Sequence, residues 1–142
     1  MRAIIVGAVV AIAAGAYWLG TANEKPDMSR ETPPADGAIV EIVLAKELSA
    51  NAQIGKTMFE AKCAVCHGIN AVGKLKVAPP LVHIIYEPSH HGDEAFQGAV
   101  ALGVRAHHWP FGNMPPVEGL SRGDVKMIVT YIRELQRANG IN

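Results

Sequence analysis

Two cysteines and a histidine are the most distinctive chemical feature of this sequence. Cys63 and Cys66 are separated by two residues, and His67 follows directly. This C-x-x-C-H spacing is the attachment signal of a c-type haem, because two thiols so placed can reach the two vinyl groups along one porphyrin edge. The histidine then lies under the iron and can ligate it through an imidazole nitrogen. The motif therefore predicts one covalent haem c bound by Cys63, Cys66 and His67.

Other functions of a C-x-x-C pair fit this chain less well. A thioredoxin-like dithiol needs a βαβ context and has no following histidine. A structural zinc site needs four ligands and usually more cysteines, whereas this chain contains only the two cysteines of the motif. No cysteine is left for a disulfide, so cysteine usage gives no indication of the compartment.

An iron ligated by one histidine needs a second axial ligand or keeps an open position. Of the five methionines, two lie in the N-terminal region and two in segments that we expect to be helical. Met114 instead lies in a loop rich in glycine and proline, and Pro115 and Pro116 restrict the backbone after it. A His67/Met114 pair would raise the reduction potential and leave no open position, which favours electron transfer over oxygen binding or peroxidase chemistry.

The N-terminus of the chain determines where this chemistry takes place. Arg2 precedes an apolar run from Ala3 to Leu19, which predicts a signal peptide or a signal anchor with Arg2 on the cytoplasmic side. Small residues permit cleavage after Ala22. The length of the run, with Tyr17-Trp18 near its end, favours an uncleaved membrane anchor over residues 3–20. In either case residues 23–142 are exported, so we expect a periplasmic location, anchored or soluble.

The 142 residues are enough for one ordinary domain and an extension. We assign residues 1–22 to the leader, 23–48 to a proline-rich tether with an extended lead-in, and 49–142 to the haem domain. Within the lead-in, Ala38–Leu48 is rich in β-branched residues and favours a short strand or an extended segment laid on the domain.

The rest of the chain has a helical pattern interrupted by loops. A helix capped by Ser49 or Asn51 runs into the cysteines, with Ile54, Met58 and Ala61 on one face and Gly55 and Phe59 on the next. Val82–Tyr86 fits a helical turn. A further helix opens at Gly92-Asp93, and the last helix begins at a Ser121/Asp124 capping box. Apolar residues expected to point inward in these last two helices are Phe96, Val100, Leu102, Val125, Ile128, Val129, Ile132 and Leu135.

Composition adds two constraints on the partners and the core. The formal net charge is +0, so the charge gives no indication of nucleic-acid binding. Long-range electrostatic steering of partners should also be weak. Aromatic residues make up only 6% of the chain, which is little for a core. A covalent haem would itself be a large apolar body around which the chain can fold.

From about Gln53 to Gln136 the chain resembles a class I c-type cytochrome of the small bacterial monohaem type. The resemblance rests on Gly55-x-x-x-Phe59, the C-x-x-C-H-G core, Ala78-Pro79-Pro80-Leu81, Met114-Pro115 and the final helix with Tyr131. It implies an all-α cytochrome c fold of three to five helices wrapped around one haem, preceded here by a single N-terminal hydrophobic helix.

The resemblance also implies two specific contacts. In the family, a proline carbonyl accepts a hydrogen bond from the proximal histidine; Pro79 has that position here, with Ala78 in place of the usual glycine. The first helix would cross the last one at Gly55 and Phe59, around Val129, Tyr131 and Ile132.

Five histidines remain, all between His83 and His108, including the pairs His90-His91 and His107-His108. The simplest interpretation is that they are polar loop residues, some bonding haem propionates or the backbone. A second interpretation is a copper or zinc site that takes one histidine from each pair, with His83 as a further candidate. A third is that one of them replaces Met114 at the iron. Arg105 and Trp109 are candidate donors to a haem propionate; otherwise they are a surface charge and ring-edge packing.

The leading hypothesis is an electron carrier rather than an enzyme, passing single electrons between partners such as a quinol-oxidising complex, a dehydrogenase or a terminal oxidase. One alternative is a haem relay subunit of a larger oxidoreductase. The other is a haem protein with a second, histidine-bound copper or zinc ion.

Overall fold

The computed structural model describes residues 37–142. The expected hydrophobic helix over residues 3–20, the cleavage position after Ala22 and most of the tether lie outside the described residues. Within residues 37–142, no helix combines the length and the apolar character needed to span a bilayer.

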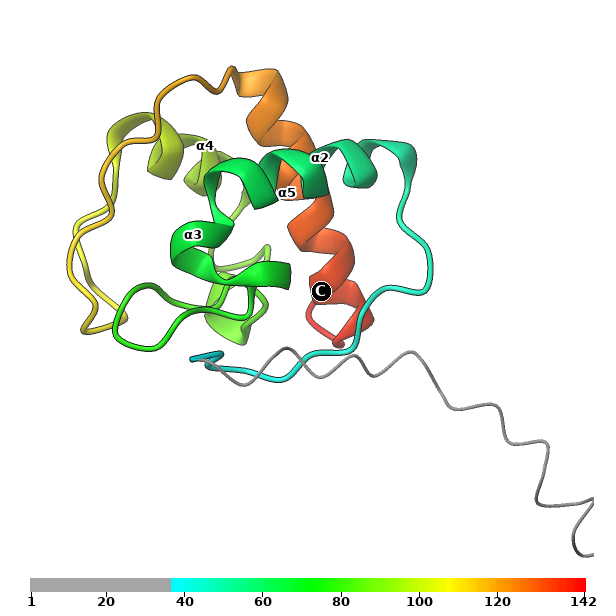
Figure 1. Cartoon of the computed structure of the whole chain (residues 1–142), viewed down its shortest axis with the longest axis horizontal. Helices are drawn as coiled ribbons and strands as arrows, with labels where there is room; N and C mark the ends of the chain where they lie inside the picture. The colour runs from blue at the N-terminus through cyan, green and yellow to red at the C-terminus, as the bar shows by residue number, and fades with distance from the viewer. Residues whose placement is uncertain (1–36) are drawn as a thin grey trace, which may run out of the picture.

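The described part of the chain is helical, as expected. It contains four α-helices and two short 3₁₀ helices, and only two isolated β-bridges in place of any strand. Figure 1 shows their arrangement, and in chain order the elements are α2 (Ala50–Lys62), α3 (Ala64–His67), η1 (Ile69–Ala71), η2 (Ile84–Tyr86), α4 (Asp93–Leu102) and α5 (Arg122–Ala138).

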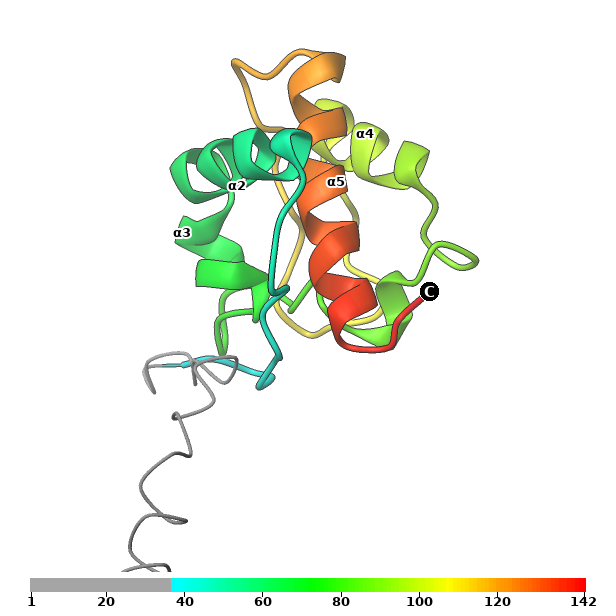
Figure 2. The same ribbon diagram turned by 90° about the vertical axis from the view of Figure 1, so that its right-hand side faces the viewer.

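The crossing of α2 over α5 is the central contact of the fold. Both figures show α2 lying across the N-terminal half of α5, and Figure 2 shows α4 on the other side of α5. A Cβ on Gly55 would lie 1.9 Å from the carbonyl oxygen of Met127, so only glycine permits this approach. The ring centroids of Phe59 and Tyr131 are 5.7 Å apart. The crosswise packing implied by the resemblance is therefore confirmed.

Helix α5 buries its apolar stripe as the sequence predicts. Its buried apolar residues are Val125, Ile128, Val129, Tyr131, Ile132 and Leu135. Ser121 and Asp124 form the expected capping box, in which the serine hydroxyl accepts from the Asp124 N–H and the carboxylate accepts from the Ser121 N–H. At the other crossing helix, Ser49 is the N-cap, and its hydroxyl accepts from the Ala52 N–H.

One apolar side chain differs from the sequence-based expectation. Leu102 was expected to point inward but is 82% exposed. At 100° per residue, Phe96 and Val100 share a face of α4, whereas Leu102 lies about 120° from Phe96 and about 160° from Val100 around the helix axis. In α2 the buried face is that of Gly55 and Phe59, while Ile54 is 48% exposed.

The lead-in before α2 is an extended segment laid on the domain and forms no strand. The N–H groups of Ile39 and Val40 both donate to the Val72 carbonyl, at 3.1 and 3.2 Å. Ile42 is buried, and the Asn139 side chain bonds both the N–H and the carbonyl of Val43. The lead-in thereby connects the loop after α3 to the end of α5.

The two glycines within α2 and α4 provide a direct test of the helix crossing. Gly55→Ala should lower the free energy of unfolding by about 1–3 kcal/mol, because its Cβ overlaps backbone atoms of α5. Gly98→Ala is the control: nothing lies within 4 Å of its Cβ, so higher helix propensity should raise stability by about 0.5–1 kcal/mol. Guanidinium unfolding of the haem-loaded chain measures both, and equal stability of the two variants would contradict the assignment.

Candidate haem site

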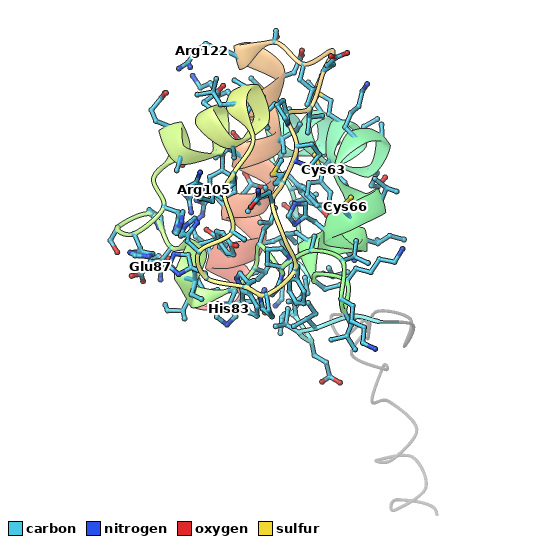
Figure 3. The ribbon with its side chains drawn as sticks, turned by 90° about the vertical axis from the view of Figure 1, so that its left-hand side faces the viewer. Cys63, Cys66, His83, Glu87, Arg105 and Arg122 are labelled. Atoms are coloured by element: carbon cyan, nitrogen blue, oxygen red, sulfur yellow. The ribbon has the colours of Figure 1, made fainter. Side chains whose placement is uncertain are left out.

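The C-x-x-C-H motif lies at the junction of α2 and α3. The Cys63 N–H donates to the Phe59 carbonyl and ends α2, and the Cys63 carbonyl accepts from Cys66 and His67. This turn places both thiols on one side of the molecule, as Figure 3 shows. Both cysteines are free, Cys66 exposed and Cys63 half-buried. Burial, and then the neighbouring Cys66, raise the pKa of the Cys63 thiol to about 11, unlike the depressed pKa of a dithiol active site.

His67 is oriented by one hydrogen bond to a carbonyl. Its Nδ1 lies 2.8 Å from the carbonyl oxygen of Pro79. A carbonyl only accepts, so Nδ1 carries the proton and Nε2 keeps its lone pair for a metal ion. The side chain is only 9% exposed. Burial lowers the pKa of His67, partly offset by the Pro79 bond, which favours the neutral ring. The contact implied by the resemblance is present.

A tightly folded loop places Pro79 against His67. The His67 carbonyl accepts from the Gly73 N–H at 2.7 Å, and Lys74 and Ala78 exchange two backbone hydrogen bonds. Gly73 has φ +77°, and a Cβ there would lie 2.5 Å from the Pro80 nitrogen. Ala78 is not among the residues with positive φ, so an alanine replaces the family's usual glycine without backbone strain.

Asn70 is a supporting residue that the sequence did not reveal. The Tyr131 hydroxyl donates to the Asn70 Oδ1 at 3.0 Å, which ties the loop after His67 to α5. Asn70 has φ 59°, a left-handed conformation that asparagine tolerates better than most residues. An asparagine two positions after Gly68 is the only sequence signal, and it is weak.

Met114 has a fixed backbone position at the base of a loop. It exchanges two hydrogen bonds of 2.9 Å with Val104 and is half-buried. Gly103 packs closely beneath, since a Cβ there would lie 2.5 Å from the Met114 carbonyl oxygen. In Figure 1 this segment between α4 and α5 runs along the edge of the molecule beyond α3. Ligation by Met114 stays a prediction.

Trp109 has a buried polar atom without a partner. Among residues 37–142, its indole Nε1 is the one buried side-chain nitrogen or oxygen that makes no hydrogen bond. Its ring packs edge-on against His83 and stacks on Phe111. Burial raises the pKa of the neighbouring Tyr86 phenol to about 12, and the nearby indole partly counteracts this rise. The indole N–H nevertheless makes no hydrogen bond to the phenol oxygen. An unused donor fits the predicted role toward a propionate.

Arg105 lies near the same loop but gives less support to that role. Its side chain is exposed, and its carbonyl accepts from His107 Nδ1 at 2.8 Å. In Figure 3 the labelled Arg105 lies to the left of the two labelled cysteines. Its interaction with a propionate stays a prediction.

Four of the remaining histidines gather in one cluster. The rings of His90, His91, His107 and His108 have neighbouring centroids 4.3–6.0 Å apart. His83 is separate from them and packs on Trp109. Partial desolvation, and then the charges of His107, His91 and His90, lower the pKa of His108. The two pairs recognised in the sequence are thus brought together, without His83.

The site as a whole fits a covalent haem. It offers two free thiols on one turn, a neutral imidazole with an open Nε2, and a buried indole N–H that lacks an acceptor. A zinc site would account for the thiols and the imidazole but not for the indole, and a dithiol active site would account for neither the imidazole nor the indole.

Comparison with known proteins identifies the family. The family model for cytochrome c matches residues 52–136. Cytochrome c2 of Pararhodospirillum photometricum is 26% identical over 106 residues, which cover 66% of this chain and 94% of that protein. No solved structure is significantly similar. The match covers more than half of the chain and includes the haem-attachment motif, so the chain belongs to the cytochrome c family, as a class I c-type cytochrome with one covalently bound haem c.

Proposed function

We propose that this cytochrome is a periplasmic single-electron carrier in which His67 and Met114 are the axial ligands of the haem iron. The haem, when bound, supplies reversible one-electron exchange between ferric and ferrous iron. The observation that carries the proposal is the His67–Pro79 hydrogen bond, which holds a buried, neutral imidazole with Nε2 free. Cys63 and Cys66 would form the two thioether bonds, and Trp109 and Arg105 would face the propionates.

The residues around the site suit a carrier because they limit reorganisation. The Pro79 carbonyl holds the His67 ring by a hydrogen bond. The loop after His67 is fixed by the bond between Asn70 and Tyr131 of α5, and α5 is in turn packed against α2. The Met114 backbone is fixed by its pairing with Val104. Ligands held in this way change little in position between the two oxidation states, which keeps the barrier to electron transfer low.

Partners would dock at the surface beside the attachment motif. Val65 and Ile69 flank the exposed Cys66 and are 70% and 56% exposed, so this surface is apolar and accessible. The net charge of +0 provides little long-range steering. We propose redox proteins as partners, such as a quinol-oxidising complex, a dehydrogenase or a terminal oxidase, reached by a domain of residues 49–142 that follows the tether and extended lead-in of residues 23–48.

Replacing Met114 tests the axial ligand. In wild type, oxidised protein should show the weak sulfur-to-iron absorption band near the red end of the visible spectrum. Met114→Leu keeps the side-chain volume but has no sulfur, so the band should vanish, the reduction potential should fall, and the reduced protein should bind carbon monoxide. Met127→Leu in α5 is the matched control and should keep the band. A band that persists in Met114→Leu would rule out Met114 as the ligand.

Replacing Trp109 tests the indole donor. Trp109→Phe keeps a ring against His83 and Phe111 but removes the N–H. A hydrogen bond to a carboxylate favours its ionised form, so its loss should raise the propionate pKa. The pH range over which the reduction potential falls should therefore move upward, measured by redox titration between about pH 5 and 9. Phe111→Leu, which removes a ring but no donor, should leave that range unchanged. An unaltered profile in Trp109→Phe would exclude the bond.

The fate of the leader can be read from the exported protein. We expect an uncleaved anchor, so the full chain should remain in the membrane fraction and keep residues 1–22 by intact mass. As a control, the same domain behind a cleavable signal peptide should appear in the periplasmic extract. A native chain that begins at Asn23 and is released with the periplasm would show that the leader is cleaved after Ala22.

A further inference from the structure

Two loops that flank α4 bring four imidazoles together on the surface. His90 and His91 lie in the loop between η2 and α4, and His107 and His108 lie in the loop that follows α4. His90 and His108 have ring centroids 5.3 Å apart, as do His91 and His108. Figure 3 shows Glu87 and Arg105, which begin these two loop regions, on the same side of the molecule. Such a gathering of like side chains, which repel when protonated, calls for an explanation.

The spacing of the ring nitrogens matches that of metal ligands. His90 Nε2 and His108 Nε2 are 3.4 Å apart, close to the ~3.3 Å that separates two nitrogens bound to one tetrahedral zinc ion. One ring nitrogen of His91 joins them, so that all three ligand atoms lie within 4.8 Å of one another. A hydrogen bond between two neutral rings could account for the first pair, but it leaves the third nitrogen unexplained.

Hydrogen bonds to backbone carbonyls orient two of the rings for ligation. His91 Nδ1 lies 2.7 Å from the Ile85 carbonyl, and His107 Nδ1 lies 2.8 Å from the Arg105 carbonyl. Each Nδ1 must carry a proton to bond a carbonyl, so in the neutral ring each Nε2 keeps its lone pair. Metal-binding histidines commonly have this arrangement, because the carbonyl fixes both the tautomer and the ring direction.

The backbone under His91 is held by a buried arginine. The Arg133 guanidinium donates to the carbonyls of His91 and Tyr86, at 2.5 and 2.6 Å, and to the Asp93 carboxylate at 2.9 Å. Its side chain is only 7% exposed and belongs to the central helix α5. The loop that carries His90 and His91 is therefore anchored to the core, which favours a defined site over a mobile polar loop.

No acidic side chain competes for the cluster in the described part of the chain. The nearby carboxylates are engaged elsewhere, Glu87 with the Ser89 hydroxyl and Asp93 with Arg133. None of the salt bridges within residues 37–142 includes a histidine. Ion pairing with carboxylates therefore does not explain why the four imidazole rings lie together.

We propose that His90, His91 and His108 form a binding site for one divalent transition-metal ion, separate from the haem iron, with His107 or water as the fourth ligand. An all-imidazole site suits Zn²⁺, Cu²⁺ and Ni²⁺, and the usual order of affinity places Cu²⁺ first. The bound ion would join the loop before α4 to the loop that ends at Met114. This inference rests on the cluster alone and does not depend on the axial ligands of the iron.

Calorimetric titration with Zn²⁺ tests the site on the haem-loaded full chain, prepared without a histidine tag. Zinc has no redox chemistry, so binding is separated from electron transfer at the iron. Wild type should bind one Zn²⁺ per chain. His90→Ala and His108→Ala should each weaken binding at least tenfold; both side chains are exposed and bond only within the cluster, so the fold should persist.

The matched control is His83→Asn. It removes an imidazole outside the cluster while keeping a side-chain acceptor for the Ile85 N–H that His83 now caps. This variant should bind Zn²⁺ as wild type does. X-ray absorption at the zinc edge should show imidazole nitrogens at about 2.0–2.1 Å.

Two results would overturn the proposal. One is the absence of stoichiometric Zn²⁺ binding to wild type. The other is binding of unchanged strength in the double variant His90→Ala/His108→Ala, which would mean that zinc is held elsewhere. The sulfur-to-iron band, measured in the same samples, reports separately on the electron-carrier proposal, so that either conclusion can fail without the other.

Discussion

The hydrogen bond from His67 Nδ1–H to the Pro79 carbonyl is the contact on which the site depends. It determines the tautomer, the direction and the basicity of the one imidazole that follows the cysteines. It forms only because the chain reverses between these residues, through Gly68, Gly73 and the paired Lys74 and Ala78. Proline is suited to the acceptor position, since it offers a carbonyl and has no N–H that needs a partner of its own.

The crossing of α2 and α5 supports the His67–Pro79 hydrogen bond. Gly55 lets α2 meet α5 backbone to backbone, and Tyr131 on α5 holds Asn70 in the loop that joins His67 to Pro79. The same helix carries Arg133, which bonds the backbone below His91. Helix α5 therefore positions the loop after His67 through Tyr131 and the loop of His90 and His91 through Arg133, and these two side chains are less than one turn apart.

Features with a local physical cause could be predicted from the sequence. The attachment motif, the Ser49 and Ser121 caps and the stripe of α5 follow from spacing and capping chemistry. Apolar character alone gives the wrong direction for Leu102, whereas the 100° periodicity of α4 separates it from the face of Phe96 and Val100. The Asn70–Tyr131 bond and the unpartnered Trp109 nitrogen could not be predicted, since each depends on residues brought together by the tertiary fold. The meeting of the two histidine pairs is one of several interpretations that the sequence leaves open, and only the fold decides among them.

The pairing of Val104 with Met114 closes the segment between them into one loop. That loop carries His107, His108 and Trp109, and Met114 lies at its base. The indole and two of the imidazoles therefore share one closed loop with Met114. If Met114 ligates the iron and the histidine cluster binds an ion, the two events would be coupled through this loop, and such coupling is reciprocal. An ion that fixes the imidazoles would oppose release of the methionine, and loss of the methionine would weaken the hold on the ion by the same factor.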